Sequence, residues 1–177
     1  MQLIHNFNLS LEDYAARGKG NDFPVITSCP ICMAQEALKR HGFYWRNAKS
    51  SNQEKWLRLP ICRLLCVSCR HTFSLLPSFL LPYYQYSLRF ILDRLMHFFS
   101  QARRLIYYQL LQFYRRRWTK NMNSIQAFFR ELGSREVIPP EFKQRAIKLL
   151  EMIAALPNAE TFSQRFHDHF RRNFMAS

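Results

Sequence analysis

Four of the five cysteines fall into two pairs with the spacing C-x-x-C. The first pair is Cys29 and Cys32, the second is Cys66 and Cys69, and 33 residues separate the pairs. Two cysteines three apart on a tight turn can present both sulfurs to one metal ion, at zinc–sulfur distances of about 2.3 Å. Two such turns complete a tetrahedron. We therefore expect one structural Zn²⁺ held by these four thiolates, with no open position for a catalytic water.

Three further side chains are alternative ligands. Cys62 forms a C-x-x-x-C with Cys66 and could replace one ligand, but its place on a strand leading into the second pair favours a buried free thiol. His41 and His71 could also bind zinc. With four cysteines available, we expect both histidines at the surface. This use of cysteine favours a reducing compartment and a metal site over disulfides.

The chain is strongly basic. Its 177 residues include 26 Lys and Arg against 12 Asp and Glu, a net charge of +14. Residues 29–133 carry 17 of those 26 basic side chains and only four of the acidic ones. Basic surfaces bind polyanions because neutralised phosphates release counterions. A hydrophobic content of 48% is too high for a disordered basic tail. We expect a folded protein whose partner is duplex DNA, with RNA as the alternative.

The segment that must hold the two cysteine pairs has the pattern of β-strands. Aromatic and branched residues gather in two stretches on either side of a polar turn at residues 47–52. In the second stretch, Leu57, Leu59 and Ile61 alternate with other residues, which is the period of a half-buried strand. We therefore expect residues 29–76 to form a small β zinc ribbon.

The pattern changes to helices from Ser87, a plausible N-cap. Apolar residues recur at spacings of three and four over residues 88–99. Residues 103–132 contain neither Gly nor Pro and give one long helix, or two with a break at residues 119–123 where helix propensity is weak. Two further helices are expected before residue 177.

The expected fold class is α+β, with a ribbon followed by an all-α domain. We divide the chain into an arm (1–28), the zinc ribbon (29–76), a Pro-containing linker (77–86) and a basic helical domain (87–177). The longest uncharged stretch, residues 71–88, is too interrupted by prolines and polar groups to cross a membrane. The first ten residues lack the basic start and apolar run of a secretory signal, so we expect a cytoplasmic protein.

Two stretches carry a resemblance to a known family. Residues 38–46, LKRHGFYWR, and residues 63–74, RLLCVSCRHTFS, resemble the zinc ribbon at the head of many bacterial insertion-sequence transposases. In those ribbons a C-P-x-C knuckle leads to an R-x-G strand, and the second knuckle ends in T-F-S. The whole chain is similar to a short bacterial family of transposase-associated zinc-ribbon proteins known as a domain of unknown function. The resemblance implies a mobile-element origin and a ribbon that binds DNA ends or assists a helix-turn-helix.

The chain departs from that family in two ways. The glycine that often follows each knuckle is replaced by Met33 and Arg70. No catalytic domain follows the ribbon, because the acids after Ser87 fall on expected helices or their flanks, with no strands to hold the two metal ions of a nuclease. We therefore expect neither an enzyme nor a small-molecule substrate.

The basic side chains suggest where DNA binds. Residues 87–99 and a recognition helix from residue 103 can be interpreted as a helix-turn-helix; the alternative is a solvated arginine face on a helix whose aromatic residues form the core. A protein–protein adaptor that docks a transposase of the same element or a polymerase subunit is another alternative. The expected phosphate contacts are Lys39, Arg40, Arg46 and Arg58 on the ribbon, and Arg103, Arg104, Arg115, Arg116 and Arg117 on the helices.

Overall fold

The computed structural model describes residues 1–50, 55–100, 108–156 and 159–176. The chain divides into two compact units, Met1–Ser87 and Leu88–Ser177. Among the described residues, the first unit contains a four-stranded sheet and the second contains helices without strands. The α+β class expected from the sequence is confirmed.

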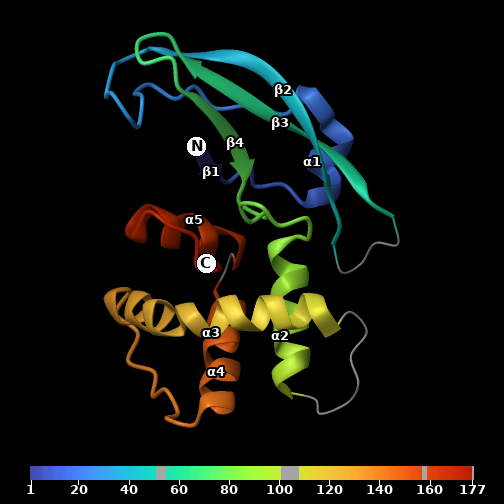
Figure 1. Ribbon diagram of the computed structural model, residues 1–177, viewed down its shortest axis with the longest axis vertical. Coiled ribbons are helices and arrows are strands. Elements are labelled where there is room, and N and C mark those ends of the chain that lie inside the picture. Colours follow the sequence, from blue (N-terminus) through green and yellow to red (C-terminus); the bar gives the residue numbers. More distant parts are fainter. Residues whose placement is uncertain (51–54, 101–107, 157–158, 177) are drawn as a thin grey trace. The chain divides into compact units, whose positions relative to one another are not determined.

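The first unit is built on a mixed sheet. Its strands are β1 (Gln2–His5), β2 (Leu38–Ala48), β3 (Leu57–Cys66) and β4 (Thr72–Pro77). They lie in the order β1-β4-β3-β2, with β1 parallel to β4 and the other neighbours antiparallel. The long strands β2 and β3 run side by side (Figure 1). This hairpin fills most of the gap between the two cysteine pairs.

Residues 1–28, expected as an arm, are instead part of the first unit. They supply β1 and the helix α1 (Leu11–Arg17), which contacts β3 and is followed by the short 3₁₀ helix η1 (Gly18–Gly20). Tyr14 of α1 is buried, and its hydroxyl donates to the Pro60 carbonyl at 2.8 Å. Because α1 covers the second face of β3, that strand is buried on both faces around Pro60, where alternation predicts an open face.

Residues 77–86, expected as a linker, also belong to the first unit. Leu80 and Leu81 are fully buried. The Arg46 guanidinium on β2 donates to the Leu81 carbonyl at 2.8 Å and to the Tyr84 carbonyl, and its burial lowers the pKa of Arg46. Burial of the apolar side chains of residues 77–86 is favoured by the hydrophobic effect. As a solvated linker, the same segment would leave those side chains in water.

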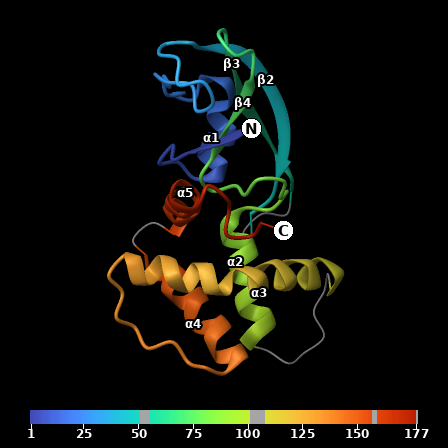
Figure 2. The ribbon, with the colours of Figure 1, turned by 60° about the vertical axis from the view of Figure 1, so that its left-hand side comes forward.

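The second unit consists of α2 (Leu88–Ser100), α3 (Tyr108–Glu131), α4 (Phe142–Ala154) and α5 (Ala159–Phe170). The helix α3 crosses α2 and α4, and contacts both (Figure 2). The sequence left open whether the stretch after residue 103 forms one helix or two; its described part is the single helix α3. No described helix combines the length and the apolar character needed to span a bilayer.

Burial overrides the weak helix propensity in the middle of α3. Trp118 and Met122 lie in the core. The buried Asn121 amide donates to the Arg117 carbonyl at 2.8 Å and to the Ala176 carbonyl at 2.9 Å, so it ties the end of the chain to α3. The described residues of the second unit include seven buried phenylalanines: Phe90, Phe99, Phe128, Phe129, Phe162, Phe166 and Phe174.

Candidate metal centre and basic surfaces

The four cysteines of the two C-x-x-C pairs converge at one end of the sheet. The Sγ atoms of Cys29 and Cys69 are 3.7 Å apart, those of Cys32 and Cys66 are also 3.7 Å apart, and all four lie within 4.8 Å of one another. Sulfurs bound at about 2.3 Å to one tetrahedral ion are about 3.8 Å from each other. The four side chains can therefore hold one metal ion, consistent with the expected structural site.

The two C-x-x-C turns, which we call the first and second knuckle, share one pattern of backbone hydrogen bonds. The Met33 amide donates to the Cys29 carbonyl at 2.9 Å, and the Arg70 amide donates to the Cys66 carbonyl at 2.9 Å. The Cys29 amide also donates to the Ala34 carbonyl at 3.0 Å, and the Cys66 amide donates to the His71 carbonyl at 2.9 Å. Met33 and Arg70 have φ of 59° and 62°, in the left-handed region that favours glycine. The tight turn is thus kept without glycine in either knuckle.

The hairpin brings the knuckles together. Leu38 at the start of β2 is the register partner of Cys66 at the end of β3. The Val67 amide of the second knuckle donates to the Ala37 carbonyl, directly before β2, at 2.9 Å. Strands of 11 and 10 residues therefore return the chain to the first knuckle, which explains how so long a gap still closes the site.

Backbone donors prepare one sulfur for metal binding. The amide of Cys69, together with that of Ser68, holds the pKa of the Cys66 thiol down at about 6, against the opposing effect of desolvation. A lowered pKa favours the thiolate, which is the form that binds metals. Cys29 and Cys66 are buried and Cys32 is exposed, so the site is close to the surface of the unit.

The alternative ligands lie outside this cluster. Cys62 is buried on β3 opposite Phe43, burial raises its pKa, and it is absent from the group of four sulfurs. His41 is exposed on β2. His71 is exposed too, and its Nδ1 lies 3.0 Å from the Cys69 carbonyl oxygen. The four-cysteine set is therefore the one that the fold brings together.

The sequence-predicted basic contacts of the first unit divide into two groups. Lys39, Arg40 and Arg58 are exposed on β2 and β3. Arg46, expected to contact phosphate, is instead half-buried and donates to backbone carbonyls of residues 77–86. A guanidinium used to fix the fold in this way is a structural group, and we remove it from the expected contacts.

The second unit shows the same division. Arg115 and Arg116 are exposed on α3, and Arg115 donates to the Gln112 side-chain carbonyl at 3.2 Å. Arg117 donates to the Met175 carbonyl at 3.1 Å, so part of its role is to hold the end of the chain. Arg103 and Arg104, and the turn of the expected helix-turn-helix, lie outside the described residues.

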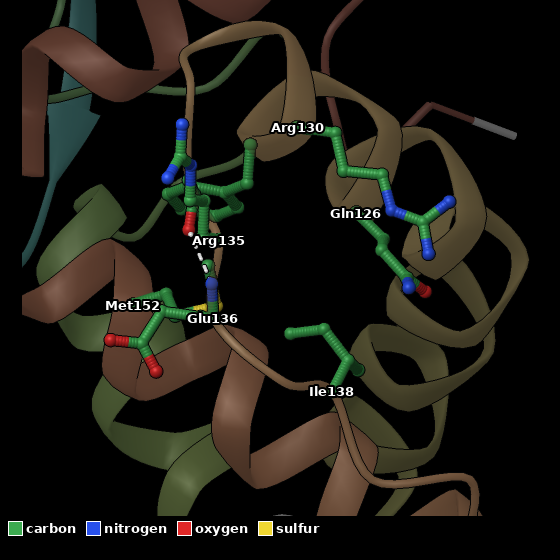
Figure 3. A pocket seen from close by; sticks show the side chains of 8 residues that line it. Gln126, Arg130, Arg135, Glu136, Ile138 and Met152 are labelled. Atoms are coloured by element: carbon green, nitrogen blue, oxygen red, sulfur yellow. Dashed lines mark hydrogen bonds between the residues drawn. The ribbon is translucent and has the colours of Figure 1, made fainter.

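A small hollow in the second unit lies between the end of α3, the segment that follows it and α4. Gln126, Arg130, Ile138 and Met152 are among its lining residues (Figure 3). Its volume is about 190 Å³, whereas pockets that bind small molecules usually measure about 300–1,000 Å³. The carboxylate of Glu136 at its rim is paired with a lysine of α4 at 2.8 Å. We assign no ligand to this hollow.

Comparison with known proteins finds one match, to a family model. Residues 29–105 match the model of a family described as a domain of unknown function (DUF6431). The match begins at the first cysteine and includes both knuckles, the strands β2, β3 and β4, and the helix α2. No curated protein and no solved structure matches the chain. The match agrees with the expected resemblance to a domain of unknown function, and its description names no activity.

Proposed function

We propose that the protein is a non-catalytic DNA-binding protein of mobile-element origin that holds duplex DNA with both units. The observation that carries the proposal is the separation of charge along the described elements. The strands β2 and β3 contain five Lys and Arg and no acid, and α3 contains five with a single acid at its last residue, Glu131. Elements with such an excess of basic over acidic side chains attract polyanions.

The metal in this proposal is zinc. Four thiolates in a tetrahedral arrangement favour zinc or an iron–sulfur centre, and two C-x-x-C knuckles on a hairpin are typical of structural zinc. The first unit is then a zinc ribbon similar to those of insertion-sequence transposases. When bound, the ion fixes the positions of the two knuckles, and it leaves no coordination site for a reacting group.

DNA is held mainly through its phosphates. Lys39, Arg40 and Arg58 supply contacts from the ribbon, and a two-stranded ribbon fits the width of the major groove. Arg115 and Arg116 supply contacts from α3, with α2 and α3 as the two helices of the helix-turn-helix. Contacts of this kind position the protein on the duplex, while base-edge contacts select a sequence.

The test is the salt dependence of duplex binding by the full-length, zinc-loaded protein. Each lost phosphate contact lowers the slope of log K against log salt concentration by about 0.9. The double variants Lys39→Ala with Arg58→Ala and Arg115→Ala with Arg116→Ala are each expected to lower it by about 1.8. The exposed Arg135, outside both surfaces, provides a matched control in Arg135→Ala, which should leave the slope unchanged.

Three results would contradict the proposal. Duplex affinity that does not change with salt would exclude a phosphate-dominated interface. Tighter binding of duplex RNA than of duplex DNA would overturn the choice of partner. Cleavage of DNA by the purified protein in Mg²⁺ would overturn the assignment as non-catalytic.

A further inference from the structure

Cations and aromatic rings alternate along one face of β2 and β3. The Arg40 Cζ atom lies 5.9 Å from the centroid of the Phe43 ring. The Lys19 Nζ atom lies 5.8 Å from Phe43 and 5.9 Å from Trp45, and the Arg58 Cζ atom lies 4.9 Å from Trp45. We call these five side chains the cation–ring strip. Each cation is within the range of an electrostatic attraction to a ring face.

The fold places the strip in a defined geometry. Phe43 and Trp45 are two residues apart on β2 and therefore point to the same face of the sheet. Arg58 comes from β3 and Lys19 from η1, so three separate elements meet there. The Phe43 ring packs against the buried Phe23 at 5.2 Å between centroids, which anchors one ring of the strip in the core.

Apart from the Lys19 and Arg58 cations, the Trp45 ring is open to solvent, and 44% of the residue's surface is exposed. A second tryptophan provides a comparison within the same unit. Trp56 is 45% exposed, and its ring packs against Tyr86 at 5.1 Å. Among the described residues, no cation lies over the Trp56 ring. The two indoles are thus equally accessible, and Trp45 is the one surrounded by positive charge.

We propose that the cation–ring strip binds unpaired DNA, with one base stacked on Trp45 and neighbouring phosphates on Lys19, Arg40 and Arg58. Single-strand sites combine a basic track with aromatic side chains on which bases stack, because every base has a π-face. Bases in a duplex are already stacked on each other and cannot cover this ring. The inference rests on the proposed function for its choice of DNA, and it adds a second binding mode at the ribbon.

The experiment compares two substitutions in the full-length, zinc-loaded protein, Trp45→Leu and Trp56→Leu. The measurement is fluorescence anisotropy of a labelled oligo(dT) of about ten nucleotides and, separately, of a duplex. Trp45→Leu should weaken oligo(dT) binding about 10-fold or more and change duplex affinity less than twofold. Trp56→Leu should leave both affinities unchanged. Trp45→Phe, which keeps a stacking ring, should restore most of the lost affinity.

Zinc content and thermal unfolding of each variant establish that the ribbon is still folded. Equal losses for the two leucine variants, or a loss at Trp45 that is as large for duplex as for oligo(dT), would overturn the inference. Tighter binding of oligo(U) than of oligo(dT) would overturn the choice of DNA. If oligo(dT) binds in a Trp45-dependent way while duplex does not bind at all, the proposed function fails and this inference stands. If duplex binds and oligo(dT) does not, this inference fails and the proposed function stands.

Discussion

The two units are nearly equal in length, Met1–Ser87 and Leu88–Ser177, but only the first has a candidate metal site among the described residues. The knuckles of the first unit bury little apolar surface: the exposed fractions of Ile31, Met33 and Val67 are 46%, 66% and 49%. In the second unit Trp118, Phe162, Phe166 and Phe174 are fully buried. In the first unit the four sulfurs meet beside turns whose apolar side chains are largely exposed, although Cys29 and Cys66 themselves belong to the core.

A metal ion bound by the four cysteines would stabilise the knuckles, whereas buried aromatic residues stabilise the second unit. The first unit also has an apolar core, which contains Tyr14 and Phe73 together with Cys29 and Cys66 of the knuckles. If the four cysteines bind a structural ion, as we propose, we expect the knuckles to depend on it more than the rest of the sheet does. The binding free energy of a structural ion contributes to folding because its site does not exist in the unfolded chain.

Removal of the metal should have the largest effect and should be confined to one unit. Structural zinc in zinc-finger peptides has an apparent binding free energy of about 10–16 kcal/mol. We expect chelation, or Cys66→Ser, to abolish the protection of amides in residues 29–37 and 66–71 against hydrogen exchange. Amides of α3 should remain protected, as measured by exchange with mass-spectrometric detection.

Cys62 provides the matched control, because it lies on the same strand as Cys66 and is equally buried. Cys62→Ala should retain one zinc per chain and the protection of both knuckles. Loss of protection throughout α3 on chelation would contradict the separation of the two units. Full protection of the knuckles without metal would show that packing alone holds them.

Truncation of the helical core should produce the next largest effect, in the opposite unit. Trp118 is fully buried on α3, and truncation of a buried Phe or Trp to Ala typically costs about 3–5 kcal/mol. We expect Trp118→Ala to lower the free energy of unfolding of the second unit by that amount in urea. Zinc stoichiometry should not change.

Trp56→Ala is the control for that measurement, because this indole is about half exposed and its truncation removes far less buried surface. Zinc loss in Trp118→Ala would indicate that the core of the second unit also supports the metal site. A change in unfolding free energy as small as that of Trp56→Ala would show that the second unit relaxes around the cavity.

Features with a local signal were predictable from the sequence. The C-x-x-C spacing indicated the four cysteines that cluster, and the repeat of apolar residues indicated α2 close to its observed bounds and a helical stretch that contains α3. Both signals arise within a few residues of the chain, where backbone geometry fixes which side chains can meet. The two strand-like stretches on either side of the polar turn were predicted from the same kind of local pattern, and they form the hairpin of β2 and β3.

Features with distant partners were not predictable. The strand β1 is only four residues long and pairs with β4, with Gln2 opposite Ser74. The Arg46 guanidinium meets a carbonyl 35 residues away, and that of Arg117 meets one 58 residues away. A single sequence contains no signal for hydrogen bonds between residues so far apart. From the sequence alone, an arginine that holds the fold together therefore cannot be told from one that binds phosphate.

The smallest expected effect has the opposite sign and tests whether the two knuckles are equivalent. Met33 and Arg70 adopt left-handed φ, which costs an L-residue about 1–2 kcal/mol, while glycine loses about 0.5–1 kcal/mol through the entropy of the unfolded chain. Met33→Gly and Arg70→Gly should each stabilise the zinc-bound first unit by about 0.5–1 kcal/mol. Chemical denaturation of the full-length protein, with zinc in excess, measures this gain.

Met33→Ala is the matched control, because alanine shortens the side chain and keeps the backbone cost of the left-handed turn. It should show no gain, and a gain equal to that of Met33→Gly would assign the effect to the side chain. The same backbone pattern in both knuckles predicts equal gains for the two glycine variants. Sites with shared partners often show non-additive changes, so a double variant whose gain differs from the sum would show that the metal couples the two turns.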